Sequence, residues 1–254
     1  MGKLENEHKL EFPEVEFVNV SKTFQQQGET LQVLNGISGK VEKGSILTII
    51  GPSGSGKSTM ISLCNLLQTP DEGQIYIEGR EIRDWDIQEL RRKVGIAFQA
   101  APMMSGTALQ NLALPATLKG EKLENPQKYM DYVGLPAELL LREAKELSGG
   151  QQQRLSLART LVNKPSILLL DEVTSALDSI SAQEVEELIL RINKERNVTI
   201  LWVTHNLEQA ERVGDQTWLV MDGRLIEGAD TKLFFTQPES EMTKEFLDMK
   251  KVQL

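Results

Sequence analysis

Short apolar runs separated by polar and amphipathic stretches set the plan of the chain. Residues 46–50 (ILTII) and 167–170 (ILLL) are continuously apolar, which is typical of strands covered on both faces. Over residues 181–195, apolar side chains recur at i, i+3, i+4 and i+7, as on one face of an amphipathic helix. This alternation predicts an α/β fold in which helices cover both faces of a mostly parallel sheet. Further strands are expected at 15–20, 31–37, 74–78, 94–98, 198–203, 217–220 and 224–226.

Local signals add detail to this plan. A helix is expected over residues 57–67, directly after the apolar run that ends at residue 50. Glu187 and Arg191 are spaced as an i, i+4 ion pair on the surface of the later helix. Residues 74–78 alternate between apolar and polar side chains, as an antiparallel edge strand would.

The whole chain, residues 1–254, is predicted to form a single domain of three parts. Residues 1–99 and 161–254 are expected to form the α/β core with an antiparallel β subdomain, and residues 100–160 an inserted helical subdomain. The Asp222-Gly223 pair lies between two apolar runs and predicts a hairpin. The prolines near expected helix starts or breaks are Pro102, Pro115, Pro126 and Pro136.

Composition narrows the classes of function. The net charge of −9 disfavours nucleic acid as a partner, because proteins that bind phosphate backbones usually carry a basic surface. A single cysteine, Cys64, excludes an internal disulfide and is expected to be a small buried side chain. No apolar run reaches the roughly 18 residues of a membrane span, and the first ten residues lack a secretory signal. We therefore expect a cytoplasmic protein whose membrane role, if any, depends on a partner.

A glycine-rich loop, GPSGSGKS at residues 51–58, joins the apolar run to the expected helix. This pattern, with a strand before it and a helix after it, predicts a phosphate-binding loop whose N–H groups point at phosphate oxygens. Lys57 is expected to reach the β- and γ-phosphates of ATP, and the Ser58 hydroxyl to ligate Mg²⁺. The expected ATP-binding residues here are Gly51, Pro52, Ser53, Gly54, Ser55, Gly56, Lys57, Ser58 and Thr59.

Two further motifs carry chemistry. The run ILLL ends in two carboxylates, and we expect Asp171 to support the Mg²⁺ shell and Glu172 to polarise the attacking water. A strand that ends in Asp-Glu is by itself common and often only solvated, but the glycine-rich loop favours the catalytic interpretation. Ser148 can cap the helix that begins at Gly149-Gly150, which makes a second anion site in the same chain.

The sequence LSGGQ at 147–151 resembles the signature motif of the ATP-binding cassette (ABC) ATPases. The resemblance runs from about Val15 to Gly228 and implies a P-loop NTPase (RecA-like) core that hydrolyses ATP with Mg²⁺. It also implies an ATP-dependent homodimer, in which the signature motif of one copy binds the γ-phosphate held by the other copy. The residues assigned to this role are Ser148, Gly149, Gly150 and Gln151.

The resemblance assigns roles to four more positions. Gln99 matches the glutamine that contacts Mg²⁺ or water, and Asp178 lies in a segment similar to the loop that couples the two sites of the dimer. His205 matches the histidine that holds the γ-phosphate, the catalytic glutamate and the water, so Glu172, His205 and Gln99 form the expected catalytic set. Phe24 stands where the family usually has a tyrosine that stacks on adenine, and its ring keeps the stacking surface.

The resemblance further implies the nucleotide-binding subunit of a transporter, attached to the inner face of the cell membrane by an integral membrane subunit. The segment 99–115 matches the region that grips this subunit, and Met103, Met104, Leu109 and Leu112 are either its docking surface or subdomain core. This segment and ILWVTHN look most like the Fet-type metal-efflux and aluminium-tolerance group, with phosphate-import ATPases second. A cassette ATPase without a transport role, of the iron–sulfur assembly or cell division type, is the remaining alternative.

Overall fold

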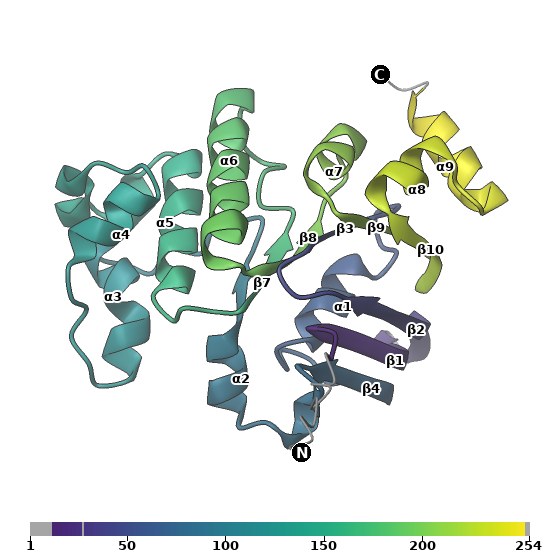
Figure 1. The fold of residues 1–254 in the computed structure, drawn as a ribbon. Helices are drawn as coiled ribbons and strands as arrows, with labels where there is room; N and C mark the ends of the chain where they lie inside the picture. Colours follow the sequence, from purple (N-terminus) through teal and green to yellow (C-terminus); the bar gives the residue numbers. More distant parts are fainter. Residues whose placement is uncertain (1–11, 27, 252–254) are drawn as a thin grey trace, which may run out of the picture.

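The computed structural model describes residues 12–26 and 28–251, and within them a six-stranded sheet organises the fold (Figure 1). Its order is β10-β9-β3-β8-β7-β6, with parallel pairs from β9 to β6 and an antiparallel pair at β10. The predicted α/β fold with a mostly parallel sheet is therefore confirmed. The strands are β3 (Ile46–Ile50), β6 (Val94–Ala97), β7 (Ile167–Asp171), β8 (Thr199–Val203), β9 (Gln216–Met221) and β10 (Arg224–Asp230).

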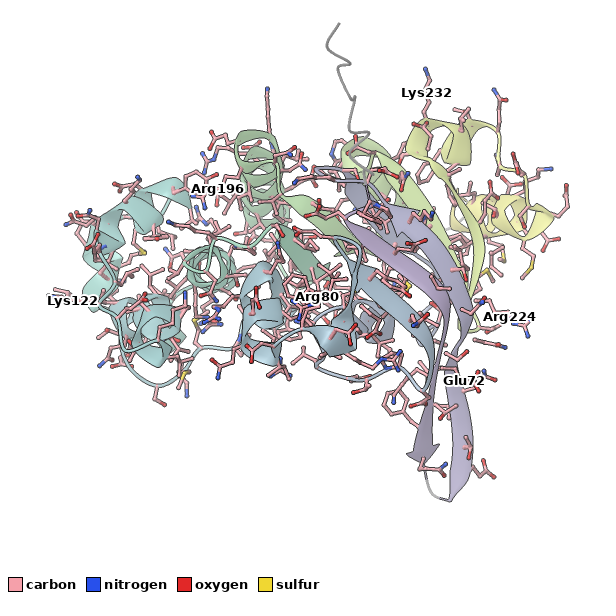
Figure 2. All side chains as sticks on the ribbon, turned by 60° about the horizontal axis from the view of Figure 1, so that its bottom comes forward. Glu72, Arg80, Lys122, Arg196, Arg224 and Lys232 are labelled. Atoms are coloured by element: carbon pink, nitrogen blue, oxygen red, sulfur yellow. The ribbon has the colours of Figure 1, made fainter. Side chains whose placement is uncertain are left out.

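A second, antiparallel sheet with the order β2-β1-β4-β5 forms the predicted β subdomain. The strand expected to lie at the edge, β4, is not the outermost one, because the two-residue strand β5 pairs with Tyr76 and Ile77. The ends of β1 and β2 extend away from the body of the protein in Figure 2. The strands are β1 (Val15–Gln26), β2 (Glu29–Val41), β4 (Glu72–Ile77) and β5 (Arg80–Glu81).

Both faces of the central sheet are covered, which explains its continuous apolar runs. Alternate residues of one strand point to opposite faces, so Leu169 packs with α1 (Lys57–Leu63) and the antiparallel sheet. Its neighbour Leu168 packs with α5 (Gly149–Leu161) and α6 (Ser179–Arg196). Because β3, β8 and β7 pair in parallel, their carboxyl ends lie side by side at one edge of the sheet. The helices and the antiparallel sheet on the two faces hold these ends in place.

The helices between β6 and β7 lie together at one side of the molecule (Figure 1). They occupy the stretch for which we propose a separate helical subdomain. Pro126 is the first residue of its helix and Pro136 precedes a 3₁₀ turn, as expected. The expectation for Pro115 is wrong, because it lies inside α3, which is held by the Thr107 capping box and by buried Leu112.

Two predictions about helices need correction. Helix α1 ends at Leu63 rather than at residue 67, and Leu66 has already left the helix with a φ of 53°. The predicted Glu187–Arg191 pair is also wrong: Arg191 donates to the Tyr132 carbonyl and stacks on the Tyr132 ring, 5.1 Å from its centroid. An exposed i, i+4 ion pair is weak, so a long side chain readily bonds to another group that the fold brings near. For Arg191 that group is Tyr132 of the helical region.

Other predicted elements are confirmed. The apolar stripe of α6 is buried, as is Cys64, and the hairpin between β9 and β10 turns at Asp222 and Gly223, both with positive φ. Among the residues that the structure describes, no helix combines the length and the apolarity needed to cross a bilayer. The remaining helices are α2 (Ile87–Lys93), α3 (Ala108–Leu118), α4 (Pro126–Tyr132), α7 (Leu207–Val213), α8 (Thr231–Thr236) and α9 (Glu241–Lys251), with 3₁₀ turns at Ile82–Asp84, Ala137–Leu141 and Ala144–Glu146.

The carboxylate of Asp71 ties the start of β4 to β1. It accepts hydrogen bonds from Lys22 Nζ (2.7 Å) and from the backbone N–H and hydroxyl of Thr23 (2.7 and 2.8 Å). These bonds, with that of Lys22 the strongest, lower the pKa of Asp71 to about 2. Because the Asp71 side chain is 39% exposed, solvent screening limits its contribution to about 1 kcal/mol or less.

We expect Asp71→Asn to lower the melting temperature slightly near neutral pH. The stabilisation by Asp71 is present above the unfolded pKa of about 3.9 and is lost as the pH falls towards the folded pKa. The difference between wild type and variant should therefore shrink between about pH 4 and pH 2 in thermal unfolding followed by circular dichroism. Glu72→Gln, at the exposed neighbour in Figure 2, is the control, and an equal pH dependence in both variants would contradict the assignment.

Candidate functional site

The glycine-rich loop lies between β3 and α1, at the carboxyl end of the central sheet. Its first glycine, Gly51, has a φ of 145°, and a Cβ there would lie 2.0 Å from the Val220 carbonyl oxygen. Gly56 has a φ of 97°, and a Cβ there would lie 2.6 Å from the Val33 carbonyl oxygen. The loop therefore needs glycine at both positions, since a side chain would clash with backbone and adopt a disfavoured conformation.

Lys57 is enclosed by the loop that precedes it. The side chain is 4% exposed, and Nζ donates to the carbonyl oxygens of Gly51 (3.0 Å) and Pro52 (2.7 Å). Burial lowers the pKa of Lys57, and the nearby charges of Glu172 and Asp171 oppose this effect. A buried cation surrounded by neutral carbonyl groups is well suited to receive an anionic ligand.

A cavity of about 330 Å³ opens above this lysine. Its lining combines the cation of Lys57 and the hydroxyl-bearing residues of the loop with two titratable side chains, Glu172 and His205. The structure thus brings together residues that follow three different strands, β3, β7 and β8. The lining residues are Val33, Ser53, Gly54, Ser55, Gly56, Lys57, Ser58, Thr59, Glu172 and His205.

Asp171 lies at the end of β7 and faces the start of α1. Its Oδ1 accepts a hydrogen bond of 2.7 Å from the Ser58 hydroxyl. Burial raises the pKa of Asp171, the bond from Ser58 lowers it, and the charge of Glu172 raises it further. A hydroxyl and a carboxylate next to each other form a set of oxygen donors, and this chemistry fits Mg²⁺.

Glu172 and His205 are in direct contact, with 2.5 Å between Glu172 Oε1 and His205 Nε2. Glu172 has a φ of 51°, which is unusual for a residue other than glycine. This conformation is held on both sides: the Glu172 N–H donates to the Val203 carbonyl (3.0 Å), and its carbonyl accepts from the Ser175 N–H (3.0 Å) and hydroxyl (2.9 Å). A strained backbone that its surroundings hold in place is common where a side chain must be aimed.

The residues of LSGGQ lie outside this cavity. Ser148 caps α5, and its hydroxyl accepts from the Gln151 N–H (3.3 Å) while the Gln151 side chain accepts from the Ser148 N–H (3.0 Å). The Ser148 cap is confirmed, and Ser148 and Gly149 remain exposed. Gly150 packs against Ser181 of α6, where a Cβ would lie 2.7 Å from the Ser181 Cβ.

Gln99, Phe24 and Asp178 are also expected site residues that do not line the cavity. Gln99 is exposed two residues after β6, and Phe24 is half-buried on β1 with Lys22 Nζ 5.4 Å from its ring centroid. Asp178 caps α6 by accepting from the backbone N–H groups of Ser181 (3.0 Å) and Ile180 (3.1 Å). Hydrogen bonding, above all from Ser181, lowers the pKa of Asp178.

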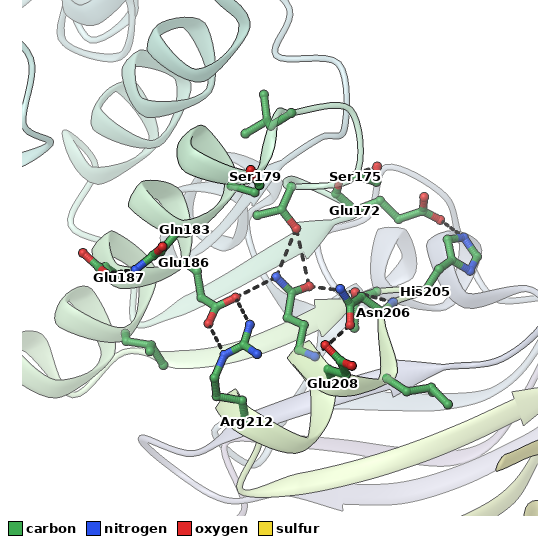
Figure 3. Close-up of a pocket in the computed structure, with 17 residues that line it drawn as sticks. Glu172, Ser175, Ser179, Gln183, Glu186, Glu187, His205, Asn206, Glu208 and Arg212 are labelled. Carbon is green, nitrogen blue, oxygen red and sulfur yellow. Dashed lines mark hydrogen bonds and ion pairs between the residues drawn. The ribbon is translucent and has the colours of Figure 1, made fainter. Parts of the chain in front are cut away.

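Sequence reasoning missed a polar network behind Glu172 and His205 (Figure 3). It borders a second cavity of about 1090 Å³ and contains buried side chains from α6 and α7. The pattern Asn206-x-x-Gln209 could have indicated a helix start, and Asn206 does cap α7. Nothing in the sequence links Gln209 to its partner Glu186, because the two meet only when α6 packs beside α7.

Comparison with known proteins gives the family. The family described as "ABC transporter" matches residues 34–175. The "Putative ABC transporter ATP-binding protein YjkB" of Bacillus subtilis is 51% identical, over 95% of this chain and 97% of that protein. The "Methionine import ATP-binding protein MetN 4" of Oceanobacillus iheyensis is 38% identical, over 92% of this chain and 70% of that protein.

The fold of a solved structure agrees with this relationship. A "dimeric structure of a post-hydrolysis state of the ATP-binding cassette MJ0796 bound to ADP and Pi" superposes with a TM-score of 0.77. It is 32% identical and covers 85% of this chain and 98% of its own. A matching family over more than half of the chain, close relatives and a shared fold lead to one conclusion: this chain is an ATP-binding ATPase of the ABC transporter family.

Proposed function

We propose that two copies of this chain bind two Mg–ATP between them and, by hydrolysing ATP, drive a separate integral membrane protein. The observation that carries the proposal is the Glu172–His205 contact, which lies across one cavity from Lys57. A base, its hydrogen-bonding partner and a phosphate-binding cation around one space are the parts that ATP hydrolysis requires.

Each site residue has a proposed role. Lys57 and the N–H groups of the loop bind the triphosphate, and the Phe24 ring stacks on adenine. Ser58, Asp171 and Gln99 would hold Mg²⁺, which when bound neutralises charge on the phosphate oxygens. Glu172 orients the attacking water, and His205 holds the Glu172 carboxylate and contacts the γ-phosphate.

A second copy is proposed to complete each ATP site. The capped helix start at Ser148 and Gly149 is exposed and lies outside the cavity above Lys57, so it is free to meet a phosphate on another molecule. The related cassette MJ0796 is described as dimeric with ADP and Pi. A head-to-tail pair with twofold symmetry would form two equivalent sites, with Asp178 near the centre.

The proposed contact with the membrane subunit lies in the segment 99–115. Leu112 is fully buried, so for this residue the core alternative holds. Met103 and Leu109 are partly buried against the helical core, and their exposed parts stay within the proposed docking surface. Met104 differs, because its side chain is 55% exposed while its backbone is held by the buried Asn111 side chain on both its N–H (2.9 Å) and its carbonyl (3.0 Å). A rigid backbone that presents a flexible apolar side chain suits an apolar segment of a membrane protein.

We expect Met104→Glu to abolish co-purification with the membrane subunit while basal ATPase activity stays near the wild-type value. A charge in an apolar contact is costly, and Met104 lies outside the ATP cavity. Leu118→Glu, at an exposed apolar side chain at the end of α3, is the matched control. Normal assembly of the Met104→Glu variant would refute this docking site, and capture of a scaffold protein without membrane spans would support the non-transport alternative.

For the solute we propose export of a metal ion or a related small solute, based on segment 99–115 and the stretch ILWVTHN. Import is the second candidate, because the relatives named as methionine importers align over 92% of this chain. Loss of metal tolerance, with unchanged uptake of methionine and phosphate, in cells lacking this chain would support export. The reverse result would support import and leave the ATPase assignment unchanged.

A further inference from the structure

Gln209 connects the segment that carries Glu172 to the segment that carries His205 through hydrogen bonds to their neighbours. Its partner Glu186 is labelled in Figure 3. Gln209 belongs to α7, and its side chain is 4% exposed. Its Oε1 accepts a 2.7 Å hydrogen bond from the hydroxyl of Thr204, the residue before His205. Its Nε2 donates to the hydroxyl of Thr174 (3.1 Å), two residues after Glu172. One buried amide thus spans the two segments that carry the pair.

The orientation of this amide is fixed by the buried carboxylate of Glu186, which an exposed arginine holds in place. Gln209 Nε2 also donates to Glu186 Oε2 (3.0 Å), and a carboxylate oxygen can only accept, so the opposite face of the amide must present its oxygen to Thr204. Arg212 holds Glu186 through two bonds of 2.7 and 2.8 Å. Burial raises the pKa of Glu186, but the bonds from Arg212 and Gln209 outweigh burial and lower it, which keeps the carboxylate charged.

The Thr204 hydroxyl links the fixed Gln209 amide to the turn that carries His205. It accepts from the Asn206 N–H (3.1 Å), so the turn is closed around His205. The Asn206 side chain in turn accepts from the Gln209 N–H (2.9 Å). The Thr204 N–H donates to the Ile49 carbonyl (3.2 Å), which anchors the same turn to the strand that leads into the glycine-rich loop.

We propose that Gln209 is a positioning residue that sets the separation between Glu172 and His205, acting through Thr174 and Thr204. This inference rests on the proposed roles of Glu172 and His205. It extends the catalytic site to a layer of side chains that ATP does not touch. The competing explanation is that the network only stabilises the packing of α7 against α6, and kinetics can separate the two.

The test compares Gln209→Met and Thr204→Val, which keep side-chain size and remove the hydrogen bond between them. We expect each to lower the kcat of Mg-ATP hydrolysis roughly 10- to 100-fold, because small displacements of catalytic groups are costly. The KM for ATP should change by no more than about two-fold. The double variant should be little worse than the worse single variant, because both changes break the same connection.

Two matched variants control for stability. Thr204→Ser keeps the hydroxyl and should retain most of the wild-type kcat. Thr217→Val removes another buried hydroxyl, whose bonds go to the hydroxyls of Thr48 (2.8 Å) and Thr231 (2.9 Å) and not to Gln209. It should lower the melting temperature as Thr204→Val does while keeping the wild-type kcat. If Gln209→Met does not fold, the contrast between Thr204→Val and Thr204→Ser carries the test.

The outcomes distinguish this inference from the proposed function. Wild-type kcat in Gln209→Met and Thr204→Val, with an inactive Glu172→Gln variant, would overturn the positioning role alone. The positioning role would also be overturned if the kcat of the double variant fell by the product of the two single losses. A loss of kcat in Thr217→Val as large as that in Thr204→Val would overturn it too. Wild-type turnover in Glu172→Gln would overturn the proposed function and this inference together.

Discussion

Glu172→Gln is expected to bind ATP normally and to hydrolyse it at least roughly 10²-fold more slowly than the wild type, a loss of about 3 kcal/mol of transition-state stabilisation. The amide has nearly the shape of the carboxylate, so the cavity and the contact with His205 can persist. It cannot accept a proton from water, and it carries no charge to orient the water. This variant should therefore keep its affinity for ATP while its rate of hydrolysis falls.

The measurement is phosphate release under saturating Mg-ATP together with a nucleotide titration. Glu187→Gln is the matched control, because it makes the same change at an exposed carboxylate of α6 that bonds only to the Gln183 side chain among the described residues. We expect that control to turn over at the wild-type rate. A Glu172→Gln variant that keeps near-wild-type turnover would remove Glu172 from the catalytic role.

Lys57→Ala should act on binding rather than on turnover alone. The variant loses the cation that now bonds to the carbonyls of Gly51 and Pro52. Charge-assisted hydrogen bonds are worth about 1.5–3 kcal/mol, so we expect the affinity for ATP to fall roughly 10- to 100-fold. Titration with a fluorescent ATP analogue measures this, with Lys128→Ala, at an exposed lysine of α4, as the control. Unchanged affinity in Lys57→Ala would refute the role of Lys57.

The sequence predicted the parts of the fold that depend on local signals. The runs 46–50 and 167–170, which became β3 and most of β7, are buried at every residue because both faces of the sheet are covered. The glycine-rich loop and the Asp171-Glu172 pair could be assigned to one site from their motifs, and they lie close together because parallel strands place their carboxyl ends at one edge. The hairpin at Asp222-Gly223 needs two residues that tolerate positive φ, and that requirement is visible in the sequence.

The remaining features depend on contacts between distant segments. Pro115 could not be placed inside α3 from the sequence, because packing of Leu112 decides that helix. The partner of Arg191 is the Tyr132 carbonyl, 59 residues away in sequence. The left-handed backbone of Glu172 is imposed by Val203 and Ser175, and it has no signature in the residue type.

One measurement tests the central claim that two copies share each ATP site. Lys57→Ala disables the loop of one chain, and Gly149→Asp disables the helix start of the other by placing a negative charge at the phosphate. The added Cβ of Gly149→Asp has Leu177 as its nearest neighbour at an ordinary 3.5 Å, so the fold should tolerate it. At an ATP concentration near the wild-type KM, each variant alone should have little activity. An equal mixture should regain ATPase activity, to roughly a quarter of the wild type if sites act independently, because each mixed dimer holds one intact site. A mixture no more active than the sum of the separate variants would contradict the account.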